Sequence, residues 1–195
     1  MGIVRTRLVW LVALAAIATA TVAALPFASQ AATAASVTVS AGGFALLNGT
    51  PAAAISFPPA TLNGTSQAVT DPLAVDIGDA TGSGSGWNVT AASTTFKSGA
   101  NALPTTATTI QSAPTASCDT GAAGCTTATT TVSYPYTLPA ATVAPTATKL
   151  FNAVANTGMG NQTFSPTWTL SIPSNAVASG TAYTSTWTFS LVSGP

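Results

Sequence analysis

The chain ends in "TAYTSTWTFSLVSGP", residues Thr181–Pro195, where apolar and hydroxyl side chains alternate at every second position. One face of this stretch carries Tyr183, Ser185, Trp187, Phe189 and Leu191, and the other carries Thr184, Thr186, Thr188 and Ser190. Because successive side chains of a strand point to opposite faces of a sheet, the alternation predicts a half-buried β-strand. Threonine and serine can coat its wet face without charge while favouring extended backbone.

The stretch "FSPTWTLSIP", Phe164–Pro173, has the same pattern. Its inward positions are Phe164, Trp168, Leu170 and Ile172, with hydroxyl residues between them. The turn-forming sequence "PSNAVASG" separates it from the final stretch. The two segments are therefore predicted to pair as antiparallel strands.

Further strands are expected wherever short apolar runs are bounded by Gly, Pro, Asn or Asp. These runs are Val37–Ala41, Ala53–Phe57, Leu73–Ile77, Trp87–Ser93, Thr129–Tyr134 and Leu150–Ala155. No long segment has helical spacing, so the sequence predicts an all-β, antiparallel sandwich or barrel-like domain. Residues 98–131 alternate least and are expected to form a loop-rich excursion at one end of the sheet.

The start of the chain has the features of a secretory signal peptide. Arg5 and Arg7 precede an uncharged apolar run that extends from Leu8 to Leu25, and small residues suited to cleavage follow it. We expect residues 1–34 to be removed, with cleavage near 31–35, which leaves a mature domain of 35–195. A retained membrane anchor is the alternative, but the small residues directly after the run favour removal.

The mature chain is nearly free of charge. It keeps Lys97 and Lys149 against Asp71, Asp76, Asp79 and Asp119. Binding to nucleic acid or to an anionic membrane surface requires clustered Lys and Arg, so neither partner is expected after processing. Disorder is disfavoured too, because apolar residues make up 47% of the sequence and high net charge is missing.

The two cysteines, Cys118 and Cys125, are separated by "DTGAAG". In an exported protein, an even number of cysteines so close together predicts a local disulfide, worth roughly 2–3 kcal/mol. A metal site would need about four ligands, and the sequence has no histidine to assist two thiols. No metal or cofactor is expected.

Catalytic candidates are few. Without histidine or glutamate, Ser-His-Asp, Cys-His and zinc-hydrolase sites are excluded. A Ser-Lys dyad in "FKSG", Phe96–Gly99, is more simply a surface lysine beside a serine. Calcium binding by Asp71, Asp76 and Asp79 matches no known loop spacing, and turn capping explains these residues better. We therefore expect a protein that is not an enzyme.

Two stretches resemble the signatures of the WxL family of Gram-positive cell-surface proteins. The first is "DIGDATGSGSGWNVTAASTTF", residues Asp76–Phe96, and the second is Asn156–Pro195, which holds the Gly-Met-Gly turn and a Trp-bearing last strand. In the expected mature chain the literal Trp-x-Leu triplet occurs only at Trp168, since Val89 and Phe189 take the third position after Trp87 and Trp187. The matching positions are Asp79, Gly86, Trp87, Val89, Gly158, Gly160, Trp168, Leu170, Trp187 and Phe189.

The resemblance implies a β-rich, secreted domain that attaches non-covalently to peptidoglycan at the cell surface, often alongside partner surface proteins. Trp87, Trp168 and Trp187 are the candidates for stacking on the sugars of a wall glycan. All three also lie on alternating apolar faces, which is where a core is built. If they are core residues, the glycan would meet the glycine-rich loops Gly82–Gly86 and Gly158–Thr163.

A structural subunit that assembles with copies of itself, into a filament or a layer, is the alternative function. Sheets usually protect their edges with charged residues, and the mature chain has only two lysines. Its first expected strand lies in "SVTVSA", Ser36–Ala41, and could be donated to the sheet of a neighbouring molecule.

Overall fold

The computed structural model describes residues 36–178 and 180–195, so the predicted signal peptide lies outside the described residues. The chain divides into two compact units, Met1–Thr38 and Val39–Pro195, and the second unit is the domain described below. No described helix is long and apolar enough to cross a membrane, and the described residues form strands, turns and irregular segments only.

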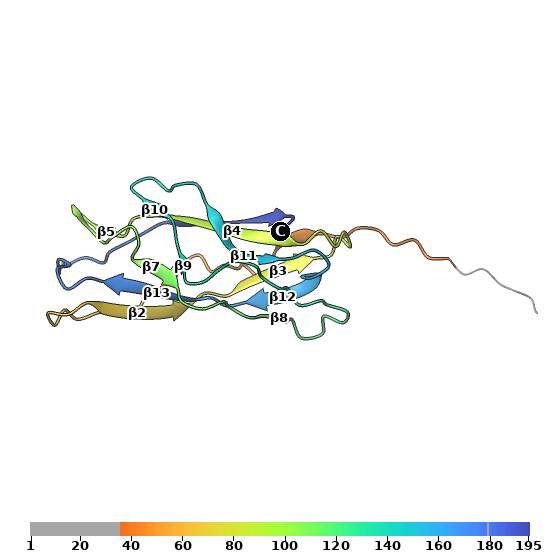
Figure 1. Ribbon diagram of the computed structural model, residues 1–195, viewed down its shortest axis with the longest axis horizontal. Helices are drawn as coiled ribbons and strands as arrows, with labels where there is room; N and C mark the ends of the chain where they lie inside the picture. Colours follow the sequence, from red (N-terminus) through yellow and green to blue (C-terminus); the bar gives the residue numbers. More distant parts are fainter. Residues whose placement is uncertain (1–35, 179) are drawn as a thin grey trace, which may run out of the picture. The chain divides into compact units, whose positions relative to one another are not determined.

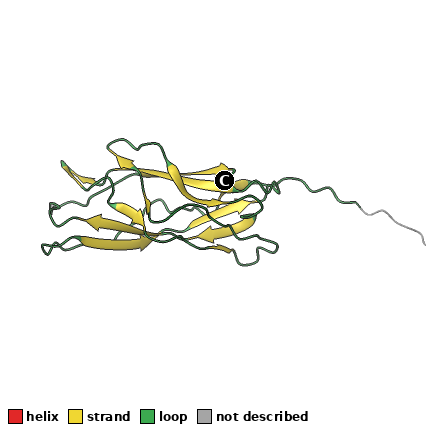
Figure 2. Ribbon diagram, in the orientation of Figure 1, coloured by secondary structure: helices red, strands yellow, loops and turns green. Residues whose placement is uncertain are grey.

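The domain is a sandwich of two β-layers (Figures 1 and 2). One layer contains sheet 1, with the order β1-β3-β12-β8, and sheet 2, with the order β2-β13-β7-β9. Sheet 1 comprises β1 (Phe44–Leu46), β3 (Val75–Asp79), β12 (Gly160–Phe164) and β8 (Ala116–Cys118). Sheet 2 comprises β2 (Gln67–Pro72), β13 (Thr167–Ile172), β7 (Thr108–Ile110) and β9 (Tyr136–Thr137).

The other layer is sheet 3, which is built around the long strand β4 (Trp87–Thr94). One side of β4 pairs with β11 (Thr148–Ala153) and, in the one short parallel pairing of the described ladders, with β10 (Ala140–Ala141). The other side pairs with β14 (Trp187–Ser193). A small hairpin of β5 (Lys97–Ser98) and β6 (Asn101–Ala102) follows β4.

Sheets 1 and 2 lie end to end because the same two chain segments run through both. The chain passes from β2 into β3 and, alongside, from β12 into β13. At the junction, the ladder is interrupted at Pro166, which has no N–H to donate. The Leu73 N–H donates to the Pro166 carbonyl at 3.1 Å and holds the two halves together.

The core fills the space between the layers with the side chains that the alternation predicted to point inward. Trp87, Phe164 and Trp168 are fully or almost fully buried, whereas the hydroxyl residues Thr188 and Ser190 of β14 are exposed. Aromatic rings meet across the two layers, with the centroids of Trp168 and Trp187 4.8 Å apart and those of Phe151 and Phe164 4.3 Å apart. The predicted all-β sandwich is confirmed, and the layers do not close into a barrel.

The predicted pairing of the last two strands is wrong. β13 pairs with β2 and β7 in sheet 2, whereas β14 pairs with β4 in sheet 3. The two strands therefore face each other across the core through Trp168 and Trp187. Because β13 and β14 lie in different layers, each of these tryptophans contacts the opposite sheet as well as its own neighbours.

Three of the expected strands are absent from the described ladders, namely Val37–Ala41, Ala53–Phe57 and Thr129–Tyr134. Residues 51–59 contain Pro51, Pro58 and Pro59, which cannot donate ladder hydrogen bonds, although Ile55 and Phe57 still pack against the core. Within residues 129–134, Thr130 and Thr131 bond instead to the buried Asn152 side chain, whose Oδ1 accepts the Thr131 N–H at 2.8 Å. The other expected strands correspond to β3, β4, β11, β13 and β14, with ends shifted by a few residues.

Residues 98–131, expected to be a loop-rich excursion, include β6, β7 and β8. β7 extends sheet 2 beside β13, and β8 extends sheet 1 beside β12. Leu103, Ala107 and Ile110 of this segment are buried. The segment thus supplies both sheets with strands.

Trp168→Ala should test the central aromatic contact. Its ring lies beside those of Tyr136, Trp187 and Phe189, so truncation leaves a large cavity. We expect the free energy of unfolding in a urea titration to fall by about 3–5 kcal/mol. The exposed change Thr188→Ala should alter it by less than about 0.5 kcal/mol, and equal effects of the two changes would contradict the proposed packing.

Candidate functional site

The two signature stretches meet at one end of the domain. The Trp87 indole N–H donates to the Gly158 carbonyl at 2.8 Å, and the Asn156 N–H donates to the Gly84 carbonyl at 2.8 Å. The chain terminus joins them, since the Gly194 N–H donates to the Gly86 carbonyl at 2.9 Å. We call the loops 80–86, 119–126 and 154–160 the signature end.

Two glycines allow this close approach. Gly158 has a φ of 76°, and a Cβ on it would lie 2.4 Å from the Ala153 Cβ and 2.6 Å from the Trp87 Nε1. Gly86 has a φ of 74°, and a Cβ there would lie 2.3 Å from the Ala153 carbonyl oxygen. A side chain at either position would separate the loops, which explains why the signatures need glycine beside the tryptophan.

The loop after β3 is organised by its own hydroxyl groups. The Asp79 Oδ1 accepts the Thr81 hydroxyl at 2.6 Å and the Thr81 N–H at 3.1 Å. The series continues outward, with the Thr81 and Ser83 hydroxyls 3.0 Å apart and the Ser85 hydroxyl donating to Ser83 at 2.8 Å. Asp79 therefore caps the turn as predicted, and Ser83 and Ser85 stand exposed in a fixed loop.

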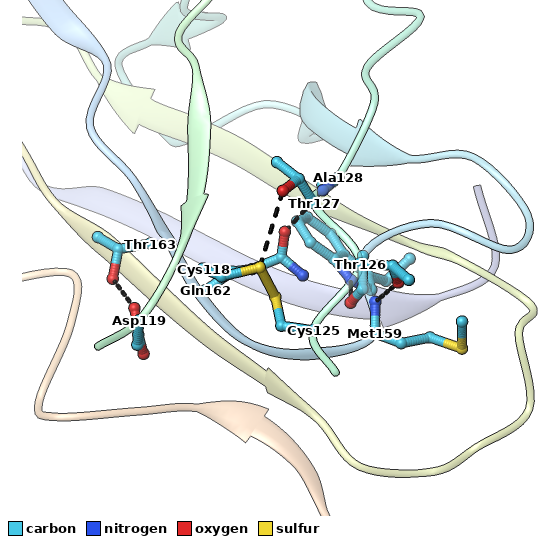
Figure 3. Close-up of a disulfide and its surroundings, with 11 residues drawn as sticks. Cys118, Asp119, Cys125, Thr126, Thr127, Ala128, Met159, Gln162 and Thr163 are labelled. Atoms are coloured by element: carbon cyan, nitrogen blue, oxygen red, sulfur yellow. Dashed lines mark hydrogen bonds between the residues drawn. A yellow bond between two sulfur atoms is a disulfide. The ribbon is translucent and has the colours of Figure 1, made fainter. Parts of the chain in front are cut away.

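The disulfide loop completes this end (Figure 3). Cys118 and Cys125 form the predicted disulfide, with their Cα atoms 6.0 Å apart. The Thr126 carbonyl accepts the Gly158 N–H at 2.7 Å, and the Thr126 N–H donates to the Met159 carbonyl at 2.9 Å. The disulfide loop is thereby attached to the second signature, a contact that the sequence did not reveal.

Of the predicted site residues, Asp79, Gly86, Trp87, Gly158 and Gly160 come together at the signature end. The other motif residues lie along the strands, and Val89 and Leu170 are buried. Trp87 and Trp168 are both 0% exposed, so neither has a free ring face for a sugar. Trp187 is half-buried and is the one of the three that keeps accessible surface.

Trp187 opens onto a groove beside β14. The groove has a volume of about 600 Å³, and its apolar lining includes Ala53, Ile55, Leu73, Phe96, Trp187 and Phe189. Residues 183–186 also line it. We call this feature the β14 groove; it lies away from the signature end, towards the start of β14.

The three aspartates considered for calcium have separate places and roles. Asp71 lies in β2 opposite Trp168, and Asp79 caps the loop described above. Asp76 is buried beneath Asn48, whose side-chain amide donates to its Oδ2, while its Oδ1 has no hydrogen-bond partner. Burial raises the pKa of Asp76; the Asn48 hydrogen bond opposes this rise, and the nearby Asp119 carboxyl adds to it.

The remaining sequence candidate was the Ser-Lys pair, Lys97 and Ser98. Both residues lie in β5, and the Ser98 hydroxyl is 2.6 Å from the Thr181 hydroxyl and donates to the Thr181 carbonyl at 3.1 Å. These bonds join the β5–β6 hairpin to the segment before β14, so Ser98 has a structural role.

Comparison with protein families gives one match. A family model described as WxL domain, surface cell wall-binding, matches residues 21–195. No curated protein and no solved structure matches the chain. The match includes both stretches that build the signature end.

Gly158→Ala should destabilise the signature end far more than Gly82→Ala. Both residues have positive φ, 76° and 66°, but a Cβ on Gly82 would meet open space. We expect a loss of about 1 kcal/mol for Gly82→Ala and at least about 3 kcal/mol for Gly158→Ala, measured by thermal and urea unfolding. Similar losses would mean that the approach of Gly158 to Trp87 is not tight.

Asp76→Asn should change the pH dependence of stability. Because the folded-state pKa of Asp76 is raised above the unfolded value, the native state binds the proton more tightly. This contribution to stability is present below the unfolded pKa and is lost as pH rises through the folded pKa. The free energy of unfolding should therefore fall across that window in the native protein and change less in the variant, as followed by urea titrations at a series of pH values. An unchanged slope in the variant would contradict this assignment.

Proposed function

The chain belongs to the WxL family of surface cell wall-binding domains, and we propose that it attaches through its signature end to the glycan strands of peptidoglycan. The family places the chain at the cell surface with a role in binding the wall. The proposal adds the ligand class, the part of the domain that makes contact, and a binding role without catalysis.

The observation that carries the proposal is the convergence of the two signatures. They are far apart in sequence, yet the Trp87–Gly158 hydrogen bond brings them to one end of the domain. Ser83, Ser85 and Asn156 are exposed there, so hydroxyl and amide groups face solvent from adjacent loops. Such groups both donate and accept hydrogen bonds, as binding to sugar hydroxyls requires.

The charge of this end favours a neutral glycan over a phosphate-rich wall polymer. Lys97 and Lys149 lie in β5 and β11 and are not part of the signature loops. The carboxylates at this end are engaged, since Asp79 bonds Thr81 and the Asp119 Oδ1 accepts the Thr163 hydroxyl at 2.8 Å. A surface without cations cannot neutralise the charge of bound phosphate groups. Binding an uncharged sugar chain requires no such neutralisation.

The buried tryptophans support this function indirectly. Trp87 fixes the 154–160 turn, and the disulfide loop is attached to the same turn. Loops that are already ordered lose less conformational freedom when they bind. The signature tryptophan therefore acts as the positioning residue for the loops, and the exposed hydroxyls act as the contacts.

Ser83→Ala/Ser85→Ala should weaken attachment of the secreted chain to purified peptidoglycan sacculi by about tenfold, because two hydrogen-bonding groups are lost. Co-sedimentation measures the affinity, and soluble peptidoglycan fragments should compete. Ser165→Ala/Ser171→Ala is the matched control and should bind as the native chain does, because these two exposed serines lie between β12 and β13 and in β13, outside the signature loops.

Sacculi stripped of anionic polymers should retain the protein. Failure to bind stripped sacculi, with the fold verified, would refute the ligand class. A Trp187→Ala variant that loses binding but keeps its stability would move the sugar site to the β14 groove.

A further inference from the structure

Independently of wall binding, we propose that the β14 groove is an acceptor for a β-strand, and that the strand it takes is residues 36–41 of a second copy of this chain. The proposal rests on a free strand edge, the lining of the groove, the pattern of the segment, and the point at which the chain enters the domain, at the end opposite to the groove.

β14 is an edge strand in the described part of the domain, because its one ladder partner is β4. The Thr186 carbonyl accepts the Thr94 N–H at 2.9 Å, so Thr186 and every second residue after it point their backbone groups towards β4. The backbone N–H and C=O groups of Trp187, Phe189 and Leu191 point the other way. They form an unpaired row that an added strand would satisfy.

The groove along this edge suits the inner face of an added strand. Ala53, Ile55, Phe96 and Trp187 give it an apolar floor and wall, and none of its lining residues is charged. Charged side chains are the usual means of blocking an exposed edge. The start of β14 lacks this protection.

The segment Ser36–Ala41 has the matching pattern but no place in a ladder. Val37 and Val39 are each 86% exposed and lie on the same side of an extended chain. In the groove their side chains would extend the inward row of Trp187 and Phe189, while Thr38 and Ser40 would join the outward row of Thr188 and Ser190. Apolar side chains would then lie beside apolar ones on the inner face of the sheet, and hydroxyl side chains beside hydroxyl ones on its outer face.

The position of the segment favours a second copy as the donor of the strand. The chain enters the domain at Gly42, whose N–H donates to the Ala80 carbonyl at 2.8 Å, at the signature end of β3. The groove is lined by Leu73, which precedes the other end of β3, and by the start of β14. A donor strand that enters the domain at one end and an acceptor groove at the other link copies head to tail, which generates a ring or an open filament and not a symmetric dimer.

The test uses the secreted full-length domain, including residues 36–41, and light scattering after size-exclusion chromatography. The native chain should form oligomers that grow with concentration. Val37→Asp/Val39→Asp places charges in the apolar groove and should weaken association by at least about tenfold, whereas Thr38→Asp/Ser40→Asp carries the same charge on the outward face and should associate as before. Ala53→Glu, at an exposed wall of the groove, should disable the acceptor.

Mixing the donor-disabled and acceptor-disabled chains gives the decisive measurement. Each is expected to be monomeric alone, and the equimolar mixture should stop at dimers, since one intact donor and one intact acceptor remain. A native chain that stays monomeric at high concentration, an effect of Thr38→Asp/Ser40→Asp equal to that of the valine changes, or a mixture without dimers would overturn the proposal. Sacculus binding of these variants should equal that of the native chain when both are measured at concentrations at which the native chain is also monomeric, which keeps this result separate from the proposed wall contact.

Discussion

The hydrogen bond from the Trp87 indole to the Gly158 carbonyl is the constraint on which this end of the domain depends. A fully buried N–H without an acceptor leaves its desolvation uncompensated, as the Trp168 indole N–H does among the described residues. The Trp87 indole N–H does find an acceptor. Here the acceptor is a backbone carbonyl that can be reached only because Gly158 has no side chain. A requirement of the core thus fixes the course of an exposed turn, and through that turn the positions of the glycine-rich loop and the disulfide loop.

The same logic replaces charge pairing elsewhere in the domain. With almost no ionic groups, the layers and connections are joined by neutral side chains that bond to backbone. Asn152 receives the Thr131 N–H, the Gln162 Oε1 accepts the Ala128 N–H at 2.8 Å, and the Tyr134 hydroxyl donates to the Leu150 carbonyl at 2.6 Å. These bonds hold residues 128–134 against the sheets in a stretch that has no ladder among the described strands. Such bonds are directional and insensitive to salt, unlike surface ion pairs, which suits a domain exposed to the outside of a cell.

The sequence predicted which side chains point inward more accurately than it predicted which strands are neighbours. Period two assigns Trp168 and Trp187 to a buried face, and both are inward, but it contains no information on which sheet each face belongs to. The hairpin prediction failed for this reason. Residues 53–57 were predicted as a strand because Ile55 and Phe57 lie two residues apart, but the neighbouring prolines cannot donate ladder hydrogen bonds, so the segment packs these side chains against the core without a ladder. At the site, the signature glycines and Trp87 were identified by sequence, whereas the disulfide loop joined it through the hydrogen bonds of Thr126 to Gly158 and Met159, which only the fold creates.

The two proposed surfaces have consequences for each other. A rigid end made of hydroxyl and amide groups gives each copy a weak contact with a repeating glycan, since neutral hydrogen bonds to sugar largely replace bonds to water. Copies linked head to tail would present many such ends along one polymer, and each further contact would then form at a high effective concentration. A chain with so little charge gains no long-range electrostatic attraction to the wall. Many weak contacts that act together are therefore the physical means by which it can be retained there. Unprotected strand edges, which are a hazard in most soluble proteins, become useful when the partner is another copy on the same surface.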